Sequence, residues 1–150
     1  MKPIPIFIGY DPREAVAYHT CANSIIRQAS QPVAIIPLAL NLFEDYTETH
    51  TDGSNQFIYS RFLVPHLMNY TGHAIFIDGD MIVRGDIVEL WNLRDPSQDV
   101  QVVKHNYKTK IKEKYPAALF KSTIATVLES SLLRSIAPVP PTDTIDPILI

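Results

Sequence analysis

Three short apolar runs, each five or six residues long, limit the fold of this chain more than any other feature. They are IPIFIG at 4–9, VAIIPL at 33–38 and AIFID at 74–78. Runs this short and this apolar are typical of strands that are buried on both faces. Because helical patterns separate them, we predict an α/β sandwich with a mostly parallel central sheet. VQVVKH at 100–105 is expected to add a further strand.

The segments between these strands predict two helical regions and one long loop. Asp11 is a good N-cap and Pro12 suits the first helical position, so a helix should begin there. A second helical segment is expected at 56–70, where Pro65 should kink or divide it. The polar stretch 40–55 is expected to be a loop. Apolar residues at helical spacing predict one buried stripe on the first helix, formed by Ala15, Tyr18, Ala22, Ile25, Ile26 and Ala29.

Charge, cysteine content and hydropathy exclude several classes of protein. With 46% apolar residues and a net charge of -3, the chain is typical of globular proteins and lacks the basic surface of a nucleic-acid binder. Its one cysteine, Cys21, cannot form an internal disulfide and is expected in the core. No stretch approaches the about 18 consecutive apolar residues of a membrane helix. We therefore expect no nucleic-acid partner, no membrane span and a cytoplasmic location.

Acidic residues and glycines stand where two of the predicted strands end. GYD at 9–11 follows the first strand, and DGD at 78–80 ends the third. Ligands of parallel α/β sheets bind beyond the carboxyl ends of the strands, so both segments are candidates for one site. Asp78 and Asp80 offer hard oxygen ligands for Mg²⁺ or Mn²⁺, and Gly79 lets the backbone turn tightly. The alternative is that both carboxylates are simply turn residues.

Three segments resemble glycosyltransferase family 8 and its close relatives with the GT-A fold. AIFIDGDMIVRGDIVELWNL resembles the signature in which an apolar strand ends in D-x-D, followed by a short strand and G-D-[LI]-x-x-L-W. The upstream QFIYSRFLVPHL resembles the family's Tyr-x-Arg helix, and IFIGYDPRE resembles its first strand and nucleotide-binding turn. The resemblance extends over residues 4–106 and implies a Rossmann-like sandwich of the GT-A type.

The same resemblance implies an activity and a set of site residues. It implies transfer from a UDP-sugar to a sugar or glycan acceptor, with retention of configuration and with Mn²⁺ or Mg²⁺ as cofactor. Asp78 and Asp80 would hold the metal, and Arg61 would reach the donor sugar or its diphosphate. The first strand's turn would line the base and ribose pocket. The implied donor-binding residues are Gly9, Tyr10, Asp11, Arg61, Asp78, Gly79 and Asp80.

Three of these residues also have a simpler interpretation. Asp11 is well placed to cap the helix that follows it. Tyr10 could simply pack against its neighbours. Arg61 could face solvent.

The sequence after residue 110 departs from the family. The resemblance implies a longer continuation with the acceptor site and a histidine of the metal shell, yet no histidine follows His105. We expect a nucleotide-sugar-binding domain at 1–110 and an atypical tail at 111–150, with an amphipathic helix at 116–136 and a proline-rich end. The sheet would then be incomplete at the C-terminus, as in a truncated or frame-shifted member. An unpaired sheet edge favours self-association.

Two other functions fit parts of the pattern. The chain could be an inactive donor-binding remnant or an interaction module that lacks the acceptor half. Haloacid-dehalogenase-like phosphohydrolases also place D-x-D after a buried strand. That family has the motif on its first strand, followed by Gly-Thr, whereas here the motif ends the third strand and is followed by Met81-Ile82.

Overall fold

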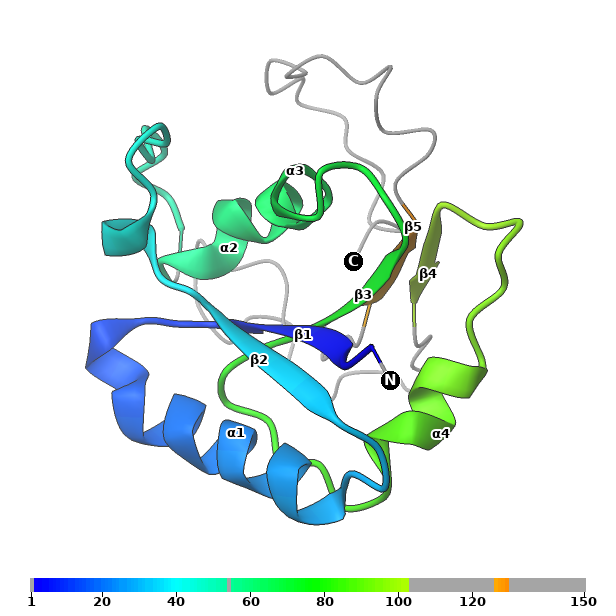
Figure 1. The fold of residues 1–150 in the computed structure, drawn as a ribbon. Helices are drawn as coiled ribbons and strands as arrows, with labels where there is room; N and C mark the ends of the chain where they lie inside the picture. The colour runs from blue at the N-terminus through cyan, green and yellow to red at the C-terminus, as the bar shows by residue number, and fades with distance from the viewer. Residues whose placement is uncertain (1, 54, 103–125, 130–150) are drawn as a thin grey trace, which may run out of the picture.

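A computed structural model describes residues 2–53, 55–102 and 126–129 of the chain. In these residues the strands form one five-stranded sheet with the order β2-β1-β3-β5-β4 (Figure 1). The sheet separates two layers of helices. The strands are β1 (Ile4–Gly9), β2 (Val33–Leu38), β3 (His73–Ile77), β4 (Val100–Val102) and β5 (Thr126–Glu129).

The three N-terminal strands confirm the predicted α/β class and its parallel sheet. Strand β1 lies in the middle and pairs in parallel with β2, from Ile4 opposite Val33 to Gly9 opposite Leu38. It also pairs in parallel with β3, with Ile8 opposite Ile77. The carboxyl ends of β1 and β3 therefore meet at one edge of the sheet.

Strand β5 differs from the sequence-based expectation. It pairs antiparallel with β3 on one side and with β4 on the other, so it lies between them. The helix expected at 116–136 is therefore wrong for residues 126–129, and its other residues lie outside the described part of the chain. A short apolar run cannot be assigned to helix or strand by periodicity alone, and here backbone pairing with β3 and β4 decides.

Alternation along the strands divides the core between the two faces of the sheet. One face carries Ile6 and Ile8 of β1, which cluster with Ile75 and Ile77 of β3. Helices α1 (Ala15–Gln28) and α4 (Ile87–Asn92) cover this face (Figure 1). The opposite face presents Phe76 and is covered by α2 (Phe57–Ser60) and α3 (Val64–Leu67). Successive strand residues point to opposite faces, so both faces of this sheet are apolar.

The first helix begins as expected but buries a narrower stripe. A 3-10 turn at Pro12–Glu14 precedes α1, and Asp11 caps it. Cys21 and Ile25 are completely buried, whereas Ile26 is 62% exposed, so its predicted place in the buried stripe is wrong. Ile26 lies about 100° around the helix from Ile25 and turns away from the sheet.

The segment 56–70 is divided, as the proline predicted. A 3-10 turn at Arg61–Leu63 separates α2 from α3, and Pro65 lies in the first turn of α3. Proline has no N–H to donate to the carbonyl four residues back, so a continuous helix loses a bond there. Among the helices of the described residues, none is long and apolar enough to cross a bilayer.

Candidate functional site

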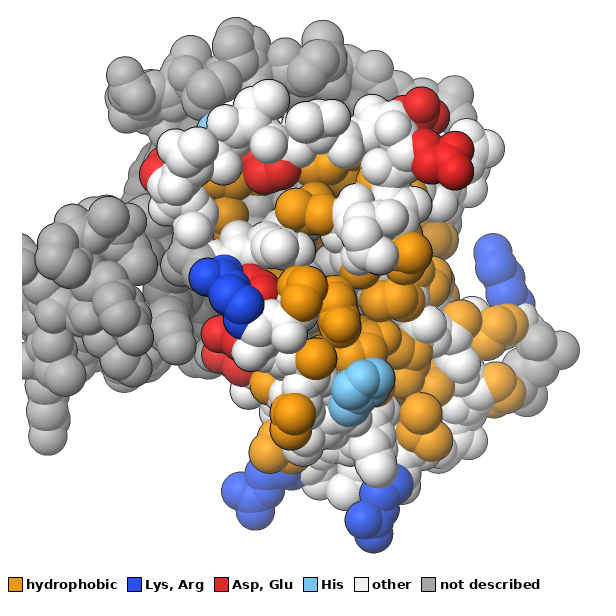
Figure 2. Space-filling view, turned by 90° about the vertical axis from the view of Figure 1, so that its left-hand side faces the viewer, with side chains coloured by type: hydrophobic (Ala, Val, Ile, Leu, Met, Phe, Trp, Pro, Cys, Tyr) orange, Lys and Arg blue, Asp and Glu red, His pale blue; other side chains and the backbone are white. Residues whose placement is uncertain are grey.

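Three segments meet where strand β1 ends. A Cβ added to Gly79 would overlap the carbonyl oxygen of Gly9, so the 78–80 turn lies directly on the tip of β1. A Cβ on Gly9 would in turn meet the ring of Phe57, at the start of α2. Figure 2 views the molecule from the side toward which β1 runs, and shows an apolar area bordered on one side by acidic and basic side chains. The two glycines allow this close approach because they have no side chain.

Arg61 is buried and points at the acidic turn. The residue is 9% exposed, and its Nη2 lies 3.3 Å from Oδ1 of Asp78. The guanidinium lies over the rings of Phe57 and Phe76, at 5.7 and 5.0 Å from their centroids, and Nε donates to the carbonyl oxygen of Phe57 at 3.3 Å. Burial lowers the pKa of Arg61, and the negative charge of Asp78 opposes that shift. The alternative of a solvent-facing Arg61 is therefore wrong.

The two aspartates of the turn lie close to Cys21, in the middle of α1. Asp78 is half-buried and Asp80 is exposed. Burial raises the pKa of the Cys21 thiol to about 11, and the negative charges of Asp80 and Asp78 add to the shift. The Cys21 thiol also lies 3.9 Å from the backbone oxygen of Asp78. Both carboxylates are thus near enough to one buried point on α1 to influence its charge.

The donor atoms of this turn suit a small divalent cation. Mg²⁺ and Mn²⁺ prefer carboxylate oxygens, and Mg²⁺ in particular is commonly held by one or two carboxylates together with water and substrate phosphate. Asp78 and Asp80 supply such oxygens. Within the described ranges, no group of three or more His, Cys, Asp or Glu side chains could hold a metal. His105 lies outside those ranges.

Asp11 is buried and its carboxylate is held by the protein itself. Nε of Arg13 donates to Oδ1 at 3.0 Å, Nη2 donates to Oδ2 at 2.6 Å, and the backbone N–H of Arg13 donates at 2.9 Å. The backbone N–H of Gln56 adds a bond at 3.2 Å from just before α2. The hydrogen bond from Arg13 is the main cause that lowers the pKa of Asp11 to about 2. Asp11 thus caps the helical turn, and it also ties the tip of β1 to α2.

Tyr10 packs against α1. Its ring meets the ring of Tyr18 edge-on, with centroids 5.2 Å apart. Its backbone N–H donates to the carbonyl oxygen of Leu38 at 3.2 Å, which extends the pairing of β1 with β2. The side chain stays partly exposed. Its predicted contact with a base therefore stays a prediction.

Sequence reasoning missed the neighbours that hold Arg61 and Asp11. Phe57 and Phe76 enclose the guanidinium, and Arg13 and Gln56 bind the Asp11 carboxylate. Alternation along β3 indicates that Phe76 and Ile77 face opposite sides of the sheet, but it does not indicate which helix covers each side. No spacing rule links Gln56 to a residue 45 positions earlier.

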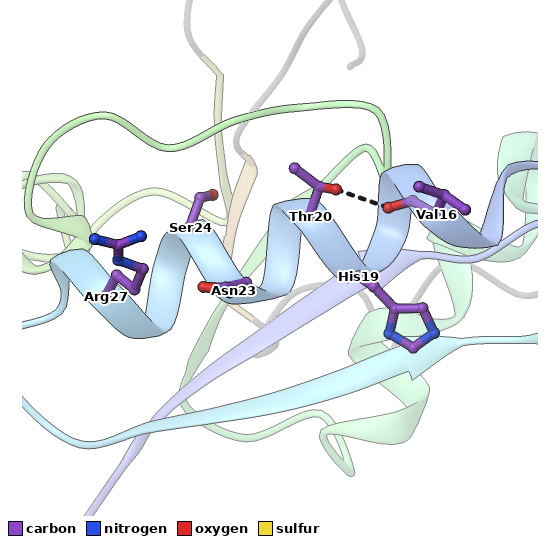
Figure 3. A pocket seen from close by; sticks show the side chains of 6 residues that line it. All are labelled: Val16, His19, Thr20, Asn23, Ser24 and Arg27. Carbon is purple, nitrogen blue, oxygen red and sulfur yellow. Dashed lines mark hydrogen bonds between the residues drawn. The ribbon is translucent and has the colours of Figure 1, made fainter.

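Two cavities of the described region are not lined by the residues of this turn. One of about 480 Å³ lies along the outer face of α1, where Thr20 donates to the carbonyl oxygen of Val16 at 2.9 Å (Figure 3). All its lining residues come from that helix, and none is a predicted site residue: Val16, His19, Thr20, Asn23, Ser24 and Arg27. The other, of about 340 Å³, is mostly apolar and is lined by Ile77 at the end of β3 and by residues of the segment 81–93. The case for a site at the turn therefore depends on contacts and charge.

Comparison with known proteins gives consistent matches. The model of Glycosyl transferase family 8 matches residues 5–125, which include every predicted site residue and extend past residue 106, where the motif resemblance ends. "Protein CDI" of Arabidopsis thaliana is 39% identical over 122 residues, covering 79% of this chain and 47% of that protein. This chain thus spans about half the length of that relative.

A solved structure shares the fold. The apo structure of the bifunctional glycosyltransferase WbbM superposes with a TM-score of 0.61 at 19% identity, over 88% of this chain and 32% of that one. An identity this low supports the fold alone. The family match covers most of the chain and leaves no support for the phosphohydrolase alternative. The chain belongs to glycosyl transferase family 8.

Proposed function

We propose that this chain binds the diphosphate of a UDP-sugar through a divalent cation, Mn²⁺ or Mg²⁺, held by Asp78 and Asp80. We further propose that binding serves transfer of the sugar, with retention of configuration, to a sugar or glycan acceptor. The observation that carries the proposal is the contact of the acidic turn with both the tip of β1 and Arg61. Family membership supports the reaction class.

The residues of the site have chemistry that suits these roles. The guanidinium of Arg61 is a planar donor that can bind phosphate oxygens in pairs. Tyr10 offers a partly exposed aromatic face and a hydroxyl group for the nucleoside. Asp11 holds the β1 tip and the start of α2 together, which keeps the nucleotide-binding turn in place. A bound divalent cation would offset the charge that develops on the departing diphosphate.

Calorimetric titration with UDP tests donor binding. We expect binding that requires Mn²⁺ or Mg²⁺ and is lost in Asp78→Asn and Asp80→Asn. The matched control is Glu89→Gln, which removes an acidic charge from the exposed surface of α4 and should bind UDP like the wild type. UDP binding that is independent of metal, or no binding by the folded wild type, would refute the proposal.

Transfer is tested separately from donor binding. The purified chain is incubated with UDP-glucose or UDP-galactose and Mn²⁺, and release of UDP is measured with and without mixed sugar acceptors. UDP release that Asp78→Asn abolishes supports the transferase proposal. Tight metal-dependent UDP binding without any release supports the donor-binding remnant instead.

A further inference from the structure

The buried guanidinium of Arg61 lies beside Asp78, one of the two carboxylates to which we assign the metal. Arg61 is 9% exposed, and Asp78 is its ion-pair partner at 3.3 Å. Across the described ranges, no other acidic side chain lies within ion-pair distance of Arg61. Its other contacts are two aromatic rings and one backbone carbonyl. Asp78 therefore has two competing positive partners if a metal binds: the guanidinium and the ion.

Electrostatics sets these two partners against each other. A charged group that is out of water is costly unless an opposite charge compensates it. A divalent cation on Asp78 would neutralise the carboxylate whose negative charge compensates Arg61. It would also place a double positive charge close to the positively charged guanidinium. Charges of the same sign a few ångströms apart repel strongly where the effective dielectric is low. Binding of the metal alone is thus disfavoured by Arg61.

A diphosphate reverses this balance. Its oxygens carry negative charge that can neutralise both the ion and the guanidinium. Arg61 is well suited to this exchange because its planar fork matches phosphate oxygens. The rings of Phe57 and Phe76 keep the guanidinium near the turn while its partner changes.

We propose that Arg61 is the resident counter-ion of Asp78 and makes metal binding depend on simultaneous binding of a diphosphate. The inference rests on the proposed function and adds a coupling to it: ion and nucleotide bind cooperatively, and neither binds well alone. Such coupling is reciprocal, so UDP raises the affinity for the ion by the factor by which the ion raises the affinity for UDP.

The test measures Mn²⁺ binding without nucleotide, by electron paramagnetic resonance of the free ion. Arg61→Met keeps an apolar side chain between the two rings and removes the charge. We expect this variant to bind Mn²⁺ about tenfold more tightly than the wild type, which corresponds to about 1.4 kcal/mol. Arg61→Lys keeps a positive charge and should stay within about threefold of the wild type. The matched control is Arg94→Met, because Arg94 also lies over an aromatic ring, at 4.3 Å from the centroid of Trp91, and donates to the Trp91 carbonyl oxygen.

A second measurement covers the case in which Arg61→Met is only marginally stable. The rise in melting temperature caused by Mn²⁺ alone should be larger for Arg61→Met than for the wild type, since binding to the folded state raises stability. The coupling is measured in the wild type by titrating UDP, and uridine as the uncharged control, with and without Mn²⁺. Mn²⁺ should strengthen binding of UDP and leave binding of uridine unchanged.

The outcomes separate this inference from the proposed function. If Mn²⁺ and UDP bind together to the wild type but Arg61→Met binds Mn²⁺ no more tightly, the counter-ion role is overturned and the proposed function stands. An equal effect of Mn²⁺ on uridine and UDP also overturns the role of the diphosphate. If the folded wild type binds no Mn²⁺ even with UDP, the proposed function itself fails.

Discussion

Replacing Gly79 by alanine perturbs the contact on which the site depends. A Cβ at this position would fall inside 3.0 Å of the Gly9 carbonyl oxygen, a separation that real Cβ atoms essentially never show. The obstructing atom belongs to backbone and not to a flexible side chain. Gly9 is also paired with Leu38 at the end of β1, so it cannot easily move away. The turn must therefore shift away from the strand, and the acidic pair shifts with it.

The expected size of the effect follows from this overlap. Inserting a methyl group into a well-packed region commonly lowers the free energy of unfolding by about 1–3 kcal/mol. Because the obstructing atom is a backbone oxygen of a paired strand, we expect the upper part of that range, about 2–3 kcal/mol. For a chain of this size that corresponds to a melting temperature lower by roughly 4–12 °C. UDP affinity in the presence of Mn²⁺ should fall by at least about tenfold, since one or two misplaced charge-assisted bonds account for that much.

The same chain offers a matched control six residues later. A Cβ on Gly85 would meet nothing within 4 Å, and its φ lies outside the left-handed region. Gly85→Ala should leave stability unchanged or raise it by up to about 1 kcal/mol, because alanine has less freedom in the unfolded chain. Melting by circular dichroism and UDP titration at 15 °C compare the two variants. A Gly79→Ala protein that melts and binds like Gly85→Ala would refute the close contact of the turn with β1.

Three further predictions test other parts of the fold. The folded pKa of Asp11, about 2, lies below its ordinary value of 3.8, so the stability that its ionised carboxylate contributes is complete above about pH 4 and is lost as the pH falls toward 2. In urea titrations, the free energy of unfolding should fall between pH 5 and pH 2.5 by on the order of 1–2 kcal/mol less in Asp11→Asn than in the wild type; the exposed side chain of its partner Arg13 reduces the full effect. Cys21 is buried and its pKa is raised to about 11, so iodoacetamide at pH 8 should label it slowly in the folded protein and quickly in denaturant, as mass spectrometry can follow. Ile25→Ala should lower the free energy of unfolding by about 2–5 kcal/mol, because Ile25 is buried. Ile26→Ala should change it by less than about 0.5 kcal/mol, because Ile26 is exposed, and equal effects would contradict the orientation of α1.

The parallel part of the sheet could be predicted because its strands need no distant information. Strands β1, β2 and β3 are short, apolar and bounded by turn residues, and a strand buried on both faces has few other possible structures. The helix start at Asp11 is equally local, since the side chain bonds an N–H two residues later. Local chemistry of this kind is readable in one sequence.

Strand β5 and the exposure of Ile26 could not be read in the same way. Residues 126–129 become a strand because β3 and β4 pair with them across long stretches of sequence. Ile26 is as apolar as Ile25, and only the rotation of α1 against the sheet decides which of the two is buried. Both outcomes depend on tertiary contacts that override local pattern.

The pairing of Arg61 with Asp78 could be predicted only in part. The D-x-D pattern marked Asp78 as a site residue, and family resemblance marked Arg61. Their pairing at 3.3 Å requires α2 and its following turn to lie on one particular face of the sheet. Nothing in the spacing of the two residues states which face that is.

Strand parity explains why these predicted residues can meet at all. On β3, Phe76 faces the α2 layer and Ile77 faces the α1 layer, so the next residue, Asp78, returns to the α2 side and meets Arg61. Gly79 then lies toward α1, consistent with the 3.9 Å between its added Cβ and the backbone of Tyr18.

The same alternation orders the tip of β1. Gly9 turns to α2 and touches Phe57, Tyr10 turns to α1 and packs on Tyr18, and Asp11 turns back to α2 and accepts from Gln56. A slip of one residue in either strand would exchange these faces and direct the carboxylates at the wrong layer. The register of β1 with β3, fixed by apolar residues on both faces, therefore determines which acidic side chain can face a buried cation. The chemistry that we propose for the turn depends on that register as much as on the identity of the aspartates.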